Sequence, residues 1–447
     1  MERLGGEDQG QRSSVRKVAL ASLLGTTVEW YDYFIYSTAA AIAFNALFFP
    51  TFDPLVGTLI AFSTFAVGFV ARPIGGAVFG HFGDRIGRKS MLVITLMIMG
   101  SVTFAIGLLP TYEQIGVMAP ILLVTLRFLQ GIGLGGEWGG AVLMATEYAP
   151  SGQRGFYGSW VQMGVPLGVI LANAAFLSVA TLPEEQLLSW GWRVPFLLSI
   201  LLVGVGLFIR LRILESPAFT QVKESNTAAR IPIVDVFRTY PKEVFLAAGA
   251  YLSSGVTFYI LIAFGLAYGT DELGLERGTM LAVVLIASVL NLVLLPVFGA
   301  LSDRVGRKRV YLVGVVAMAV LAFPLFWLLN TTTFVLILLG YLLMMVAFSA
   351  VYGPQATFFA ELFGTRVRYS GLSLGYQLGT LIGSALTPTI ATALLVATGT
   401  EASVALYMIA VGVVSFASVW LLPETFQTSM LEEREPERKL IAEREGG

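Results

Sequence analysis

The chain has 447 residues, of which 56% are hydrophobic and 13% are charged, and its mean hydropathy is +0.78. A soluble domain is about half apolar and roughly a quarter charged, so this composition excludes an ordinary soluble protein and indicates an integral membrane protein. The net charge of −1 argues against a nucleic-acid partner, the absence of cysteine excludes disulfides and thiolate metal sites, and a single histidine argues against a histidine metal centre.

The first 17 residues are polar and mixed in charge, and we expect them to form a cytoplasmic tail. The apolar run after them is too long for the core of a signal peptide, so no cleavage is expected. A spanning helix needs roughly 20 apolar residues, and the chain offers twelve such runs. They lie near residues 18–48, 55–80, 91–109, 119–148, 154–181, 193–212, 243–270, 277–301, 310–329, 333–362, 368–397 and 402–422.

One long polar connection, residues 213–242, separates the sixth run from the seventh. It is rich in charged residues and contains two prolines, as expected of a cytoplasmic linker between domains. We therefore predict an all-α membrane protein with two bundles of six spanning helices, 18–212 and 243–422. A cytoplasmic C-terminal tail, 423–447, follows the second bundle.

A charged motif occurs twice, each time between two apolar runs. The pattern G-x-x-x-D-R-x-G-R-K starts at Gly80 and again at Gly299, so that Asp303 follows Asp84 by 219 residues, about half the chain. Charge of this density cannot lie in hydrocarbon, so each copy must form a short loop between spanning helices. The repeat predicts that the two bundles are pseudo-symmetric.

A second pair of charges repeats with a common spacing. Glu147 precedes Arg154 by seven residues after the fourth run, and Glu361 precedes Arg368 by seven residues after the tenth. The layout expected of such a duplication is two parallel bundles with the substrate path between them.

The distribution of basic residues predicts the orientation. Of the 28 lysines and arginines, 24 fall in the termini and the even-numbered loops, whereas the odd-numbered loops carry acidic residues. Cytoplasmic loops carry the excess of lysine and arginine. Both termini and both copies of the motif are therefore expected on the cytoplasmic side of the cell (inner) membrane.

Two full copies of this motif between twelve spans resemble the major facilitator superfamily, and the resemblance covers nearly the whole chain. Finer stretches are similar to its metabolite:proton symporter branch, which includes shikimate, α-ketoglutarate and proline/betaine carriers. They are V-E-W-Y-D-Y from Val28, L-Q-G-I-G-L-G-G-E-W-G-G from Leu129 and R-I-L-E-S-P-A-F from Arg212.

The resemblance implies the major facilitator fold and secondary transport driven by the proton gradient. We expect a symporter that imports a small, shikimate-like organic acid by alternating access, and import of proline- or glycine betaine-type zwitterions is the alternative. The expected partners are the solute, protons and the lipid bilayer, with no cofactor and a monomeric protein. A receptor that binds without carrying is a third hypothesis. No catalytic constellation is visible, so we expect no enzyme.

Five charged residues interrupt the predicted spans of the N-terminal half. They are Glu29, Asp32, Arg72, Arg127 and Glu137. Each charge at the bilayer centre costs at least about 2.5–3.5 kcal/mol, so a functional role is expected. Counting about 1.5 Å per residue from the inner helix ends places Glu29, Arg72 and Glu137 in one layer, with Asp32 and Arg127 further from the cytoplasm.

We interpret Asp32, Glu29, Glu137 and Arg72 as the proton-coupling set. With three carboxylates against two guanidiniums, and because arginine stays charged, the group that takes the proton must be a carboxylate. Asp32 is the preferred site, since Glu29 and Glu137 can both pair with Arg72. A fixed bridge between Glu137 and Arg72, and a helix cap by Asp32, are the structural alternatives.

Arg127 resembles the mid-span arginine of span four in many proton-coupled relatives. There it could hold a substrate carboxylate by a forked pair of hydrogen bonds, or hold Asp32 until protonation frees it. Packing is the alternative role for the aromatic residues of the spans. The residues assigned to substrate binding are Arg127, Tyr33, Trp138, Gln162, Tyr251, Tyr352 and Gln377.

By resemblance, the acids of the repeated motif pair across the bundles with arginines near Arg154 or Arg368 and hold the outward-open state. Setting the topology alone is the other possible role of these charges. The residues assigned to this gating motif are Gly80, Asp84, Arg85, Gly87, Arg88, Glu147, Arg154, Asp303, Arg304, Gly306, Arg307, Glu361 and Arg368.

Overall fold

The structure is a computed structural model that describes residues 2–50, 54–179, 182–224 and 232–430. Over these residues the chain is helical almost throughout, and no β-strand is present in them. The helices of the first half are α1 (Glu2–Ala39), α2 (Asn45–Phe48), α3 (Pro54–Ile86), α4 (Arg88–Gly107), α5 (Tyr112–Ile115), α6 (Met118–Tyr148), α7 (Arg154–Leu177), α8 (Glu184–Gln186) and α9 (Arg193–Arg212).

The linker contains two short helices, α10 (Pro217–Glu224) and α11 (Pro232–Thr239). The helices of the second half are α12 (Pro241–Tyr259), α13 (Gly265–Ala267), α14 (Arg277–Val305), α15 (Arg307–Asn330), α16 (Phe334–Ala360), α17 (Arg368–Thr380), α18 (Thr387–Thr398) and α19 (Ala402–Leu421). Five π-helical turns extend or join these helices: η1 (Ala40–Phe44), η2 (Leu187–Gly191), η3 (Ile260–Phe264), η4 (Tyr268–Glu272) and η5 (Leu381–Ala385).

The predicted all-α membrane fold is confirmed. Ten helical segments among the described residues are long and apolar enough to cross a membrane. The remaining two of the twelve predicted spans correspond to α1 and α3, which are 38 and 33 residues long and exceed the roughly 20 residues that a span requires. Several predicted single spans are helix pairs joined by π-turns, such as α12 with α13 and α17 with α18.

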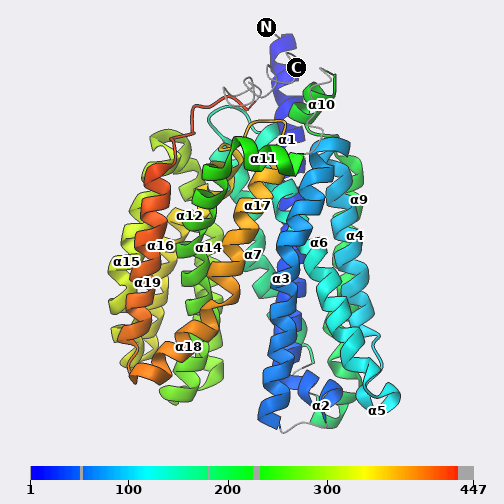
Figure 1. Ribbon diagram of the computed structural model, residues 1–447, viewed down its shortest axis with the longest axis vertical. Coiled ribbons are helices and arrows are strands. Elements are labelled where there is room, and N and C mark those ends of the chain that lie inside the picture. The colour runs from blue at the N-terminus through cyan, green and yellow to red at the C-terminus, as the bar shows by residue number, and fades with distance from the viewer. Residues whose placement is uncertain (1, 51–53, 180–181, 225–231, 431–447) are drawn as a thin grey trace.

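The helices form two groups, which Figure 1 shows side by side. We call α1 to α9 the N-bundle and α12 to α19 the C-bundle. The main contacts between the bundles are those of α3 with α17 and of α7 with α14 and α16. α1 begins at the end of the molecule where Arg368 binds the carbonyl of Met430, and we call this end the terminal side.

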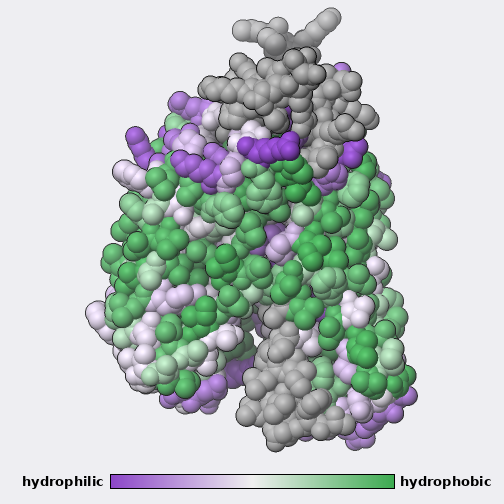
Figure 2. Space-filling model, viewed as in Figure 1, coloured by the Kyte–Doolittle hydropathy of each residue, from purple (hydrophilic) through white to green (hydrophobic). Residues whose placement is uncertain are grey.

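The surface has the polarity of a membrane protein. Figure 2 shows a broad hydrophobic band around the middle and hydrophilic residues toward both ends. Large aliphatic side chains of the spanning helices are well exposed, for example Leu201 of α9 at 64%, and Val313 and Val320 of α15 at 68% and 67%. A soluble monomer rarely exposes so extensive an apolar surface, so lipid is the environment that fits it.

The two ends of the chain differ from the predicted tails. α1 starts at Glu2, so residues 2–17 continue the first span as helix. Residues 423–430 return to the bundles, because the side chain of Thr425 and the carbonyl of Thr428 are both hydrogen-bonded there. The rest of the predicted C-terminal tail, 431–447, lies outside the described residues.

Candidate functional site: the interface between two bundles

The two acids of the repeated motif join the bundles on the terminal side. Asp84, at the end of α3, accepts hydrogen bonds from the backbone N–H groups of Tyr369 and Ser370, at 3.1 and 2.9 Å. Asp303, at the end of α14, accepts the corresponding bonds from Gly155 and Phe156, at 2.8 and 2.9 Å. Each carboxylate therefore occupies the positive N-terminal end of a helix in the opposite bundle.

This geometry differs from the predicted pairing with arginine side chains. The N-termini of α17 and α7 begin at Arg368 and Arg154, so the predicted location is close. The donors are nevertheless backbone groups, because the first N–H groups of a helix have no partner within the helix and point toward the acid.

Two glutamates hold the arginines of these helix ends. Glu147 binds Arg88 Nη1 at 2.7 Å within its own bundle and Arg368 Nη1 at 3.0 Å across the interface. Glu361 binds Arg307 Nε at 3.2 Å within its bundle and lies 4.0 Å from Arg154 Nη1 across the interface. The two clusters follow the internal repeat.

The environment of Glu361 is closed to solvent. Its side chain is 0% exposed, and Thr425 donates a further hydrogen bond to it at 2.7 Å. Burial raises the pKa of the Glu361 carboxyl above its ordinary value, against the lowering effect of the Arg307 guanidinium.

A third repeated element was not identified from the sequence. Glu215, after α9, accepts hydrogen bonds from the backbone N–H groups of Arg88 and Lys89. Glu424, after α19, accepts the same bonds from Arg307 and Lys308. The sequence similarity between these two segments is short, since it is limited to Glu-Ser at 215 and Glu-Thr at 424.

Ser216 and Thr425, the residues that follow these glutamates, complete the repeat. Ser216 binds Glu147, and Thr425 binds Glu361. The linker and the C-terminal segment therefore take equivalent positions, one against each motif copy.

Glycines make the motif loops compact. Gly87 separates α3 from α4 with φ +127°, and Gly306 separates α14 from α15 with φ +105°. A Cβ atom at either position would also meet the carboxylate of Glu215 or Glu424. Gly80 allows close helix approach, since a Cβ there would lie 2.8 Å from Ser370 Cα. Two other gating candidates, Arg85 and Arg304, are exposed.

In the middle of the N-bundle, Glu137 of α6 pairs with Arg210 of α9 and not with Arg72. The guanidinium of Arg210 forks onto both carboxylate oxygens, Thr95 donates to the same carboxylate at 2.7 Å, and both charged residues are 0% exposed. Gly25 of α1 leaves the space that this pair fills. The fixed bridge between Glu137 and Arg72, one of the structural alternatives considered from the sequence, is therefore wrong.

The error has a physical reason. Arg210 stands in the last turn of α9, at the end of the predicted span 193–212, so it does not appear among the five charges expected inside the spans. Depth counted along each span assumes that all helices end at one level. The two helices end at different levels, however. Tyr148, the last residue of α6, donates to the carbonyl of Glu215, which lies three residues beyond the end of α9 at Arg212.

Asp32 is connected to Arg127 through two neutral side chains. Arg127 donates to Gln130 at 2.5 Å, Gln130 donates to Thr103 at 2.7 Å, and Thr103 donates to Asp32 Oδ2 at 2.7 Å. All three bonds point toward the carboxylate, as an ionised acceptor requires. Asp32 Oδ1 accepts no hydrogen bond from the described residues.

The remaining two charges, Arg72 and Glu29, are buried, and neither forms an ion pair with a described residue. Arg72 is 3% exposed, and its guanidinium carbon lies 4.5 Å from the ring centroid of Phe69 and 5.5 Å from that of Tyr33. Glu29 is 4% exposed, and its Oε2 accepts no hydrogen bond from the described residues.

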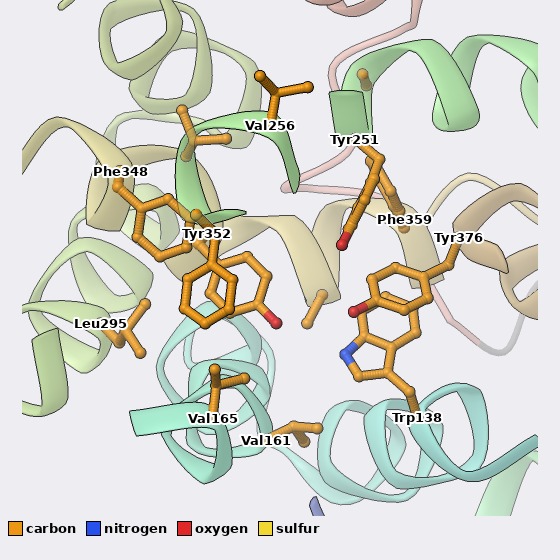
Figure 3. Close-up of a cluster of buried hydrophobic side chains, with 14 of the residues drawn as sticks. Trp138, Val161, Val165, Tyr251, Val256, Leu295, Phe348, Tyr352, Phe359 and Tyr376 are labelled. Atoms are coloured by element: carbon orange, nitrogen blue, oxygen red, sulfur yellow. The ribbon is translucent and has the colours of Figure 1, made fainter. Parts of the chain in front are cut away.

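Aromatic residues cross the interface between the bundles. Tyr259 of α12 donates to the hydroxyl of Tyr33 at 2.6 Å. The indole of Trp138 stacks on Tyr376 of α17, with ring centroids 3.5 Å apart and planes inclined by 13°. Figure 3 shows the hydroxyls of Tyr251 and Tyr376 pointing toward the same centre beside Trp138.

Among the predicted substrate-binding residues, the two glutamines form hydrogen bonds between the bundles, whereas Tyr251 forms one within its own bundle. Gln162 accepts from Trp138 Nε1 at 2.8 Å and donates to the carbonyl of Tyr352, while Gln377 donates to the carbonyl of Gly135. Both glutamines are thus engaged in contacts between the bundles. Of the tyrosines, Tyr251 bonds Ser384 at 2.9 Å, within its own bundle.

The contacts described above close the interface on the terminal side. On the opposite side the ribbons of the two bundles diverge (Figure 1). Buried charges of the N-bundle and tyrosines of the C-bundle thus meet between two lobes that are joined at one end. This arrangement defines a class: a polytopic membrane transporter with its solute path between two related bundles.

Comparison with known proteins identifies the family. The model of the Major Facilitator Superfamily matches residues 23–381. The chain is 42% identical over 419 residues to the "Shikimate transporter" of Escherichia coli (strain K12), covering 92% of this chain and 95% of that one. The chain belongs to the Major Facilitator Superfamily, whose members matched here are transporters and not enzymes.

Two further similarities extend this result. The chain is 37% identical over 422 residues to a "Glycine betaine/proline/ectoine/pipecolic acid transporter" of Dickeya dadantii (strain 3937), covering 92% of this chain and 83% of that one. The solved structure of the proton:xylose symporter XylE bound to 6-bromo-6-deoxy-D-glucose has a TM-score of 0.79 at 18% identity, covering 96% and 99% of the two chains. This structural likeness concerns the fold.

Proposed function

We propose that this protein is a proton-coupled symporter that imports a small organic acid of the shikimate type by alternating access. The 42% identity to a shikimate transporter over nearly the full length of both chains supports this substrate class. We further propose that it acts as a monomer in the cell membrane with both termini in the cytoplasm, because lysine and arginine are concentrated on the terminal side.

The charge balance inside the N-bundle is the observation that carries proton coupling. Three carboxylates, Glu29, Asp32 and Glu137, are buried there, and Arg210 raises the number of buried guanidiniums to three. The set is neutral when every member is ionised. A monoanionic solute adds one negative charge in a medium where uncompensated charge is expensive. One proton taken up with the solute restores neutrality.

Asp32 is the proposed site of that proton. Glu137 is engaged with Arg210 and Thr95, whereas Asp32 has a single hydrogen-bond donor and one oxygen without a partner among the described residues. Its link to Arg127 runs through Thr103 and Gln130. Protonation of Asp32 would remove the charge toward which these bonds are oriented. Glu29 is the second candidate.

The contacts at the terminal side suit a latch for the outward-facing state. With that side cytoplasmic, the bonds of Asp84 and Asp303 to helix N-termini close the path inward. Rotation of the bundles into the inward-facing state must break both pairs of bonds together with the bridge of Glu147 to Arg368. The symmetric placement means that both halves of the latch release in one movement.

Uptake by proteoliposomes tests the function. Purified protein is reconstituted, an inside-alkaline pH gradient is imposed, and labelled shikimate is followed over time. We expect accumulation above the external concentration, and its loss when ionophores collapse both the pH gradient and the membrane voltage. Uptake that continued unchanged without either gradient would contradict proton coupling.

Import of a zwitterion is the second candidate, supported by the relative that carries glycine betaine, proline and related solutes. Stacked aromatic rings such as Trp138 and Tyr376 are a surface on which a quaternary ammonium group binds by cation–π attraction. Competition distinguishes the candidates: excess glycine betaine should leave shikimate uptake unchanged if the organic acid is the solute, and should suppress it if the site takes betaines.

A further inference from the structure

Arg72 differs from the other arginines buried within the N-bundle. Arg210 forks onto Glu137 and also donates to the carbonyl of Leu92. Arg127 donates to Gln130 and lies over the ring of Tyr36, 4.2 Å from its centroid. Arg72 makes no hydrogen bond or ion pair with any described residue, although its side chain is only 3% exposed.

The position of Arg72 on α3 directs it toward the C-bundle. Residues spaced three or four apart share one face of a helix, and Gly76, Gly80 and Gly83 continue the face on which Arg72 stands. A Cβ at Gly76 would lie 3.1 Å from Gln377, and Cβ atoms at Gly80 and Gly83 would meet Ser370 and Tyr369. This face of α3 therefore packs on α17, and Arg72 lies one turn beyond the last of these contacts.

The surroundings of Arg72 provide the rest of a site. Phe69 and Tyr33 flank its guanidinium, and the hydroxyls of Tyr33 and Tyr259 meet at the same level between the bundles. Guanidinium donors on one side and tyrosine hydroxyls on the other suit a solute with one carboxylate and several hydroxyl groups.

We propose that Arg72 is the residue that binds the carboxylate of the transported solute, through a forked pair of hydrogen bonds, in place of the role first assigned to Arg127. This inference rests on the proposed function as a carrier of carboxylate solutes. A buried guanidinium without an acceptor is unfavourable, and a carboxylate arriving in the path supplies the acceptors. Arg127 instead keeps the hydrogen-bonded chain to Asp32.

With Arg72 assigned to the carboxylate of the solute and Arg127 to Asp32, the binding of the solute and the uptake of the proton can be linked electrostatically. Glu29 and Arg72 are both buried, and neither forms an ion pair with a described residue, so the guanidinium of Arg72 is open to a carboxylate of the solute. The solute thus adds negative charge to a bundle that already holds the carboxylates of Glu29 and Asp32, and a proton on one of these two compensates for it.

Binding to the purified full-length protein tests this inference. Affinities for shikimate, its methyl ester and glycine betaine are measured by isothermal titration for the wild type, Arg72→Lys, Arg72→Gln and Arg309→Lys. Lysine keeps the charge but cannot form the fork. Arg309 is exposed and serves as the matched control for an arginine-to-lysine change. Thermal unfolding of each variant checks that it is folded.

We expect wild-type protein to prefer shikimate over its methyl ester. Arg72→Lys should weaken shikimate binding by about tenfold or more, equivalent to about 1.4 kcal/mol, and Arg72→Gln should abolish the preference for the acid. Arg309→Lys should bind as the wild type does. The acid-to-ester ratio of the wild type is informative even if a variant unfolds.

The outcomes separate this inference from the proposed function. Shikimate binding that is equal in wild type and folded Arg72→Lys overturns the role of Arg72 and leaves the organic-acid carrier standing. Binding of betaine alone, weakened by Arg72→Lys, supports the carboxylate site and overturns the organic-acid substrate. A wild type that binds the ester as tightly as the acid overturns the carboxylate site directly.

Discussion

Asp84 and Asp303, 219 residues apart in the chain, make the same pair of hydrogen bonds to the first backbone N–H groups of a helix in the opposite bundle. The two copies of the motif therefore make equivalent contacts between the bundles. Each bundle contributes one aspartate and also the helix N-terminus that binds the aspartate of the other bundle. The predictions below concern this joint, the buried charges and the motif glycines.

Replacing Asp84 with Ala should loosen the terminal side. The change removes two charge-assisted hydrogen bonds between the bundles, so the closed arrangement loses stability relative to one that is open there. The chain has no cysteine, so a single Cys at Ser373, which is 1% exposed on α17, reports on the interface. Its labelling by a maleimide should accelerate at least about threefold, which corresponds to about 0.7 kcal/mol.

Asp303→Ala should accelerate the same labelling, because the two acids hold one rigid interface. Arg309→Gln, an exposed position near the second motif copy, is the control and should leave the rate unchanged. Equal labelling rates in all four proteins would show that the acids do not hold the bundles together.

Breaking the Glu137–Arg210 pair should destabilise the protein strongly. Each partner is fully buried, so removing one leaves an uncompensated charge, at a cost of roughly 3–5 kcal/mol. Glu137→Gln and Arg210→Gln should each lower the unfolding midpoint in detergent. The double variant should lose less than the sum of the two.

The same measurement discriminates between the two candidate partners of Glu137. Arg72→Gln should have a much smaller effect on unfolding, because Arg72 makes no ion pair with the described residues. Additive losses for Glu137 and Arg210, or strong coupling between Glu137 and Arg72, would contradict the observed pairing.

Asp32→Asn should separate coupling from translocation. The amide cannot take up and release the transported proton, so accumulation of shikimate against its gradient should be abolished. Exchange of labelled for unlabelled solute across proteoliposomes needs no net proton movement and should continue. Normal uphill accumulation by the variant would exclude Asp32 as the proton site and leave Glu29 as the remaining candidate.

Gly87→Ala and Gly306→Ala should each destabilise the fold by about 1–3 kcal/mol, because alanine is strained at these positive φ angles. A Cβ there would also displace Glu215 or Glu424 from the backbone N–H groups that they bind. Thermal unfolding provides the measurement. Two control positions separate the causes of the effect.

Gly116 has a positive φ of 60° with no neighbour within 4 Å, so Gly116→Ala reports the backbone strain alone. Gly278 lies in α14 with no such φ and open space, and alanine there should be neutral or stabilising by about 0.5–1 kcal/mol. Losses at Gly87 and Gly306 no larger than at Gly116 would mean that the two glutamates contribute little.

The fold could be predicted from the sequence because the bilayer requires each spanning segment to be a long apolar helix. Twelve apolar runs of spanning length and two copies of a charged motif leave few arrangements, and the observed helix ends fall close to the predicted ones except for the start of α1 at Glu2. The π-turns that interrupt the spans, such as η3 and η5, were not predicted, since they change neither hydropathy nor length enough to be visible.

The pairing of the buried charges could not be predicted in the same way. All five mid-span charges were found to be buried, but which carboxylate meets which guanidinium depends on how far each helix is displaced along its axis. Arg210 belongs to the last turn of α9 and still reaches Glu137, well inside α6. A linear count of residues carries no information on such displacements.

The acids of the motif bind backbone N–H groups, and this has a consequence for the history of the chain. The donor cannot be lost by changing the side chains of Tyr369, Ser370 or Phe156, unless proline replaces one of them. A change of side chain at these three positions therefore leaves the donor in place, and no compensating substitution is required at the acid; Gly155, where a Cβ would meet the backbone of Gly299, is the exception. Correlated substitutions between the two halves of the sequence should therefore be weak between each aspartate and the residues whose backbone N–H groups it binds.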